Sequence, residues 1–168
     1  MGMITAFGDS VLKGVIYEDD HYRVTDASFQ KICEESFGIT IENFTATYRS
    51  IINEIKDLGK TPVLLSMPPI DSARYFKQIS KGLCAENIMK WMRNDSQYIT
   101  NWHERYNIEI FKLAISTQVP VIDITSIFLE KKNYSRFLCE DGIHPNEEGH
   151  KLIATAIEEH VRRRRIVL

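Results

Sequence analysis

Short apolar runs punctuate this chain, separated by longer segments of mixed character. Three of these runs predict buried strands, at residues 4–7, 63–66 and 119–125. A shorter β-branched run at residues 39–42 predicts one more strand. Because these runs are almost wholly apolar rather than alternating, we expect strands that are buried on both faces, as in a parallel sheet.

The segments between the runs carry apolar residues every three or four positions, which predicts amphipathic helices at residues 24–37, 46–58 and 146–163. Gly38 and Gly59 end the first two helices, and Pro145 marks the start of the third. Strands that alternate with helices predict an α/β fold with helices on both faces of the sheet. The helix at residues 46–58 can cross the first strand, so the predicted sheet has four parallel strands in the order second, first, third, fourth.

Residues 71–118 have a different character, because they are rich in aromatic residues and lie between the last two predicted strands. We expect a largely helical, lid-like insertion that begins at the carboxyl edge of the sheet, where ligands of such folds bind. Its aromatic side chains can pack the insertion onto the domain or form a substrate wall, and both alternatives stay open. Candidate substrate contacts at this edge are Asp9, Pro68, Trp91 and Trp102.

Composition limits the protein class. The length of 168 residues suits a single domain, and a formal net charge of −2 argues against a general nucleic-acid or membrane binder. The run of arginines at residues 162–165 fits a solvated helix end, although an anionic partner stays open. Three cysteines without a framework spacing, and no leader at the start of this sequence, predict a cytoplasmic protein in a reducing compartment.

Two short motifs carry candidate chemistry. Gly8, Asp9 and Ser10 follow the first predicted strand, while Asp141 and His144 share one loop before the last helix. A serine hydroxyl becomes a competent nucleophile when an imidazole accepts its proton and a carboxylate orients that imidazole. Each motif alone also fits a capped helix start. Together they predict a catalytic triad of Ser10, His144 and Asp141.

The two motifs, "FGDS" and "DGIHPNEEGH", resemble the first and last sequence blocks of the SGNH (GDSL) hydrolase family. The resemblance implies a three-layer α/β/α, flavodoxin-like fold with Ser10 as nucleophile. It implies an esterase or lipase that forms an acyl-serine, with no metal or organic cofactor. Candidate substrates are small ester molecules: short acyl esters, O-acetylated sugars, lysophospholipids or acyl thioesters.

The chain departs from the family pattern in its middle, where the second and third blocks and about one αβ unit are missing. In the family these blocks supply donors of the oxyanion hole. Here the backbone N–H of Ser10 remains, and Asn43, after the strand at residues 39–42, is a candidate second donor. The alternative to an enzyme is therefore a binding or interaction domain with an impaired site. A partner chain can also supply the missing unit, so a homo-oligomer stays open.

Other polar residues give weaker signals. Asp123 lies near the end of the last predicted strand and competes with Asp141 as the partner of His144. The spacing of the remaining histidines predicts no metal site, and Cys84 and Cys139 have no neighbouring histidine or basic residue in the sequence, so we expect structural roles for them.

Overall fold

The computed structural model describes residues 17–18, 21–22 and 41–166. Within this part a parallel pair of strands forms the centre of the fold: β3 (Leu64–Leu65) and β4 (Val121–Ile122). Leu64 is in register with Val121, and the backbone N–H of Ser66 donates to the carbonyl of Ile122 at 3.0 Å. The predicted strands at residues 63–66 and 119–125 are thus confirmed as parallel neighbours, in shorter form.

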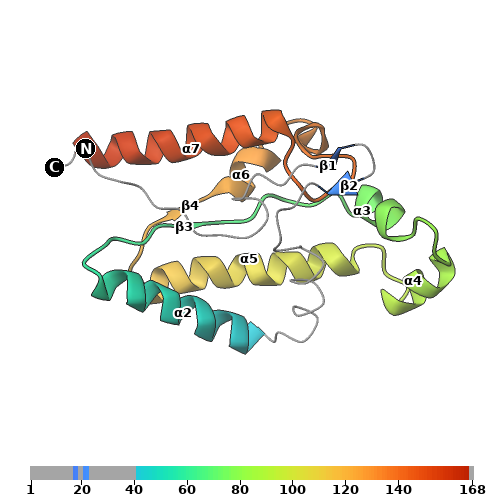
Figure 1. The fold of residues 1–168 in the computed structure, drawn as a ribbon, viewed down its shortest axis with the longest axis horizontal. Helices are drawn as coiled ribbons and strands as arrows, with labels where there is room; N and C mark the ends of the chain where they lie inside the picture. Colours follow the sequence, from blue (N-terminus) through green and yellow to red (C-terminus); the bar gives the residue numbers. More distant parts are fainter. Residues whose placement is uncertain (1–16, 19–20, 23–40, 167–168) are drawn as a thin grey trace.

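Two helices follow and cover one face of this pair, α6 (Ile124–Leu129) and α7 (Glu147–Ile166), with the short 3₁₀ turn η1 (Tyr134–Phe137) between them (Figure 1). Their shared core holds Ile122, Phe128 and Ile153, all buried. The other face carries α2 (Ile41–Asp57) and α5 (Tyr98–Thr117). A second core fills that side, formed by Ile52, Leu64, Ile110, Leu113, Ala114 and Val119.

Leu64 and Ile122 therefore bury their side chains on opposite faces of the strand pair, as the period of two in a strand requires. The result is a layer of helices, a layer of strands and a second layer of helices. The predicted α/β class is confirmed in this coarse form. The structure describes no four-stranded sheet.

The predicted strand at residues 39–42 is wrong in its described part, because Ile41 and Glu42 open helix α2. The reason is that apolar spacing of four residues continues through this stretch: Phe44, Tyr48 and Ile52 share one face, and all three pack in the second core. The β-branched run favoured a strand locally, but burial of the helical face decides the structure. The helix ends near Gly59 as predicted, and Gly59 adopts a left-handed backbone with φ of 67°.

The aromatic-rich segment at residues 71–118 forms three helices, α3 (Ser72–Ile79), α4 (Ala85–Trp91) and α5. It is helical as expected, but α5 does not form part of a lid. It packs along α2 and buries Ile110 and Leu113 against the strand pair, so it is the helix that connects two parallel strands.

Two-residue strands β1 (Tyr17–Glu18) and β2 (His21–Tyr22) pair antiparallel, an element the sequence did not predict. The predicted strand at residues 4–7 and helix at residues 24–37 lie outside the described residues. Within the part of the chain that the structure describes, no helix is both long and apolar enough to cross a membrane.

Candidate active site

Asp141 and His144 form a buried pair in the loop before α7. Nδ1 of His144 lies 2.5 Å from Oδ2 of Asp141, and both side chains are 0% exposed. The other carboxylate oxygen accepts the backbone N–H groups of Ile143 at 3.0 Å and of His144 at 3.2 Å. The aspartate thus orients the imidazole and ties it to its own backbone. This confirms the predicted pairing of the two residues.

Backbone hydrogen bonds on both sides of the turn hold the pair. The N–H of Cys139 donates to the carbonyl of His144 at 2.7 Å, and Leu138 forms an isolated antiparallel bridge with Pro145. Asn146 caps α7, since its Oδ1 accepts the N–H of Gly149 at 3.0 Å. The loop is therefore a closed, hairpin-like turn.

Gly142 occupies the tightest point of this turn. Its φ of 78° lies in the left-handed region that side chains disfavour. A Cβ at this position would come within 2.6 Å of the carbonyl oxygen of Asp71 and 2.7 Å of Cβ of Arg74. Only glycine lets the start of α3 approach the loop so closely.

The electrostatics of the pair favour a charged aspartate. Burial by itself raises the pKa of the Asp141 carboxyl, but hydrogen bonds from His144 and from backbone N–H groups outweigh burial and hold the pKa below its usual value. Farther along α7, burial lowers the pKa of His150, and the charge of His144 lowers it further.

The other predicted site residues have separate environments or lie outside the described residues. Ser10 and Asp9 lie outside the described residues. Asp123 does not pair with His144: it caps α6, accepting the backbone N–H of Ser126 at 2.9 Å. Asn43, nominated at a strand end, instead lies exposed in the first turn of α2, which removes the geometry on which its oxyanion role was based.

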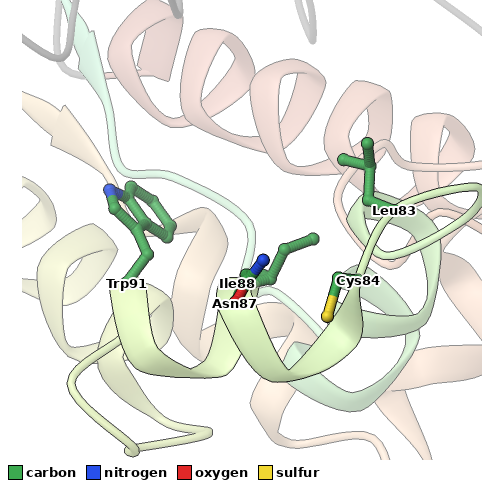
Figure 2. Close-up of a pocket in the computed structure, with 5 residues that line it drawn as sticks. All are labelled: Leu83, Cys84, Asn87, Ile88 and Trp91. Carbon is green, nitrogen blue, oxygen red and sulfur yellow. The ribbon is translucent and has the colours of Figure 1, made fainter.

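The candidate substrate contacts have three different environments. Pro68 is buried just after β3, and Trp102 is half-buried on α5, where its ring centroid lies 4.5 Å from that of Tyr106. Trp91 is 49% exposed at the end of α4. Trp91 belongs to a pocket of about 270 Å³ that is lined also by Leu83, Cys84, Asn87 and Ile88. Figure 2 shows Trp91 and Leu83 at its two ends.

A buried polar network that the sequence did not predict ties the carboxyl ends of the two strands to α5. Nδ2 of Asn107 donates to Oγ1 of Thr125 at 2.8 Å, and Oδ1 of Asn107 accepts the N–H of Met67 at 2.9 Å. Oγ of Ser66 accepts the N–H of Thr125 at 2.9 Å. The sequence feature that could have indicated this network is Asn107, a polar residue within the apolar face of α5.

Cys139 is buried and Cys84 is exposed. Among the residues that the structure describes, no group of three or more histidine, cysteine, aspartate or glutamate side chains is arranged to hold a metal ion.

Helices on both faces of a parallel strand pair define an α/β protein, and the buried Asp–His pair lies in the loop before its last helix. A sequence profile of the GDSL-like lipase/acylhydrolase family matches residues 15–157, and the chain belongs to this family. No curated protein sequence matches the chain significantly.

Solved structures with a similar fold include a lipase/acylhydrolase from Enterococcus faecalis, with a TM-score of 0.56, 20% identity and coverage of 76% of this chain and 54% of that one. An acetylxylan esterase from Geobacillus stearothermophilus gives a TM-score of 0.51 at 19% identity, covering 77% and 50%. A GDSL-like lipase from Bacteroides thetaiotaomicron has a TM-score of 0.56 at 16% identity, with coverage of 82% of this chain and 60% of that one. The chain thus spans about half to three fifths of the length of these proteins.

Proposed function

We propose that this protein is a serine hydrolase of carboxylic esters that works through an acyl-serine intermediate. The buried pair of Asp141 and His144, with 2.5 Å between Oδ2 and Nδ1, carries the proposal. Because the aspartate engages Nδ1, Nε2 is the ring atom that exchanges a proton with a nucleophile. A dedicated, oriented imidazole of this kind is what a serine nucleophile requires.

In the proposed mechanism, Nε2 of His144 accepts the proton of the Ser10 hydroxyl as Oγ attacks the acyl carbonyl. The carboxylate of Asp141 stabilises the imidazolium that forms. The imidazolium then protonates the leaving alcohol, and the carbon–oxygen bond of the ester breaks. A water molecule, deprotonated by the same imidazole, releases the acid and restores Ser10.

Two further observations support an ester substrate. The family is one of lipases and acylhydrolases, and the similar folds include an acetylxylan esterase, for which a serine-to-alanine and a histidine-to-alanine variant are catalytic mutants. Short acyl esters and O-acetylated sugars are therefore the first substrates to test. The apolar pocket beside Trp91 suits an apolar or sugar-ring portion.

A second candidate is a binding or interaction domain that retains the Asp–His pair but hydrolyses esters slowly or not at all. Asn43 lies in a helix, and the side-chain amide of Asn107, which lies near the strand ends, is already engaged by Met67 and Thr125. Among the described residues neither asparagine is therefore positioned as an oxyanion donor, and loss of one such donor costs roughly 10² to 10³ in rate, about 3–4 kcal/mol. This observation favours weak activity.

The decisive experiment combines hydrolysis of p-nitrophenyl acetate with phosphonate labelling followed by mass spectrometry. We expect the wild type to hydrolyse the ester and to carry one phosphonate on Ser10. Ser10→Ala abolishes both, while Ser96→Ala, at an exposed position before α5, retains both. Equal hydrolysis by wild type and Ser10→Ala contradicts the enzyme. A wild type that neither hydrolyses the ester nor takes up the phosphonate identifies the binding domain.

A further inference from the structure

Arg74, on α3, extends its side chain to the segment that precedes Asp141. Its Nη1 donates to the carbonyl of Ser135 at 2.7 Å. The same nitrogen lies 3.4 Å from each of the carbonyl oxygens of Leu138 and Cys139. One guanidinium thus faces three backbone acceptors of the chain segment that leads into the Asp–His loop. A charged donor makes such bonds about twice as strong as a neutral one.

Asp71 fixes the arginine in place. Its carboxylate caps α3 by accepting the N–H of Arg74 at 3.0 Å, and it lies 3.5 Å from Nε of the same arginine. The backbone N–H of Asp71 also donates to the carbonyl of Gly142 at 2.7 Å. The start of α3 therefore holds the loop at two places, through a backbone bond at Gly142 and through the guanidinium.

Cys139 is where these contacts reach the Asp–His pair. Its carbonyl faces Arg74 and accepts the N–H of Gly142 at 3.1 Å, while its N–H donates to the carbonyl of His144 at 2.7 Å. The Cys139 backbone therefore holds the turn that carries Asp141 and His144 at two places, at Gly142 and at His144. A shift of Cys139 therefore moves His144, because the two residues share a backbone hydrogen bond.

We infer that Arg74 is a positioning residue for His144, acting through the backbone of Cys139 and Gly142. The inference deepens the proposed function, because its kinetic consequence rests on ester hydrolysis. Its structural consequence does not, since the geometry of the Asp–His pair can be measured in a protein that hydrolyses nothing. The two can therefore fail separately.

The kinetic test compares Arg74→Met with Arg163→Met, which removes the same charge from an exposed position on α7. We expect Arg74→Met to lower kcat about tenfold to a hundredfold, the cost typical of a displacement of about 1 Å at a reacting group. KM stays close to the wild-type value, since substrate binding is not altered. Arg74→Lys retains one donor toward Ser135 and recovers part of the rate. Arg163→Met matches the wild type.

The structural test follows the proton between Nδ1 of His144 and Asp141 by NMR. A short, buried hydrogen bond gives a far-downfield proton signal, which is assigned by its loss in His144→Gln. We expect the signal to shift or broaden in Arg74→Met, to change less in Arg74→Lys, and to stay unchanged in Arg163→Met. If Arg74→Met does not fold, Arg74→Lys carries the comparison.

Thermal unfolding of each variant separates positioning from simple support of the fold. A lower Tm in Arg74→Met together with an unchanged downfield signal and unchanged kcat in the folded protein overturns the inference. If the wild type has no esterase activity, the NMR comparison alone decides whether Arg74 positions His144, because the NMR signal reports the geometry of the Asp–His pair. An altered signal there supports the positioning role even as the proposed function fails.

Discussion

Two neighbouring regions of the molecule differ sharply in how they are held. The loop at residues 137–146 buries Asp141 and His144 completely and joins its ends by backbone bonds. The adjoining segment at residues 72–91, which contains α3 and α4, has no buried residue in either helix, and both helices are wholly described. The regions meet at Asp71, the residue that caps α3, whose backbone N–H donates to the carbonyl of Gly142.

The difference fits the roles that we propose for the two regions. Proton transfer requires atoms held within a fraction of an ångström, so the Asp–His pair is buried, hydrogen-bonded and surrounded by backbone. Contact with an apolar part of a substrate tolerates looser placement, and short exposed helices with few buried contacts belong to the less stable parts of a fold. Changes in the loop are therefore expected to cost far more than matching changes in the helical segment.

The largest expected effect comes from the carboxylate of the pair. Asp141→Asn keeps the shape of the side chain but removes the charge that stabilises the imidazolium and sets its tautomer. We expect kcat for p-nitrophenyl acetate to fall about 10⁴-fold, equivalent to roughly 5 kcal/mol.

The matched control is Asp123→Asn, because asparagine caps a helix nearly as well as aspartate. We expect this variant to keep the wild-type kcat. A loss in Asp123→Asn as large as in Asp141→Asn would show that the rate does not depend on which aspartate pairs with His144.

The second expected effect compares two glycines with similar backbones. Gly142 has φ of 78° and Gly82, between α3 and α4, has φ of 71°. Gly142→Ala places a methyl group against the Asp71 carbonyl, so we expect a loss of about 3–5 kcal/mol in the free energy of unfolding. Gly82→Ala meets no atom within 4 Å and costs about 1 kcal/mol of backbone strain.

Urea unfolding of both glycine variants measures this difference. Equal losses would show that backbone strain alone, and not the approach of α3 to the loop, makes glycine necessary at residue 142.

The same contrast explains what the sequence could predict. The Asp–His pairing was predictable because both residues lie within one turn, where spacing fixes their distance. The helices at residues 46–58 and 146–163 were predictable because their apolar faces repeat locally. The strands beside them were predictable because both are unbroken apolar runs.

The remaining features depend on contacts between segments far apart in the chain. Arg74 and Ser135 are 61 positions apart, and Asn107 and Met67 are 40 apart, so no local pattern marks either pair. The strand expected at residues 39–42 is wrong in its described part, residues 41–42, because a helix there brings Phe44 and Tyr48 into the core. Asn43 was misplaced with that strand.

The smallest effects are expected at Trp91 and Trp102. From the sequence alone, either tryptophan could pack the fold or contact substrate. Trp102 packs on Tyr106, which in turn packs edge-on against Phe44 of α2, at 4.9 Å between ring centroids. Trp102→Ala therefore opens the contact between two core helices, and we expect a loss of about 2 kcal/mol in unfolding free energy. Trp91 is half exposed, and Trp91→Ala changes that free energy by no more than about 0.5 kcal/mol.

For KM we expect the opposite order, with the larger change in Trp91→Ala and the smaller one in Trp102→Ala. Loss of about 1 kcal/mol of contact in the pocket beside Trp91 raises KM for an ester with an apolar or sugar-ring portion about fivefold, with kcat unchanged. Trp102→Ala leaves KM within about twofold of the wild type. Kinetics with such an ester and with p-nitrophenyl acetate measure the split. Unchanged KM in Trp91→Ala for both substrates would remove the α4 pocket from the substrate path and limit the exposed segment to a role outside catalysis.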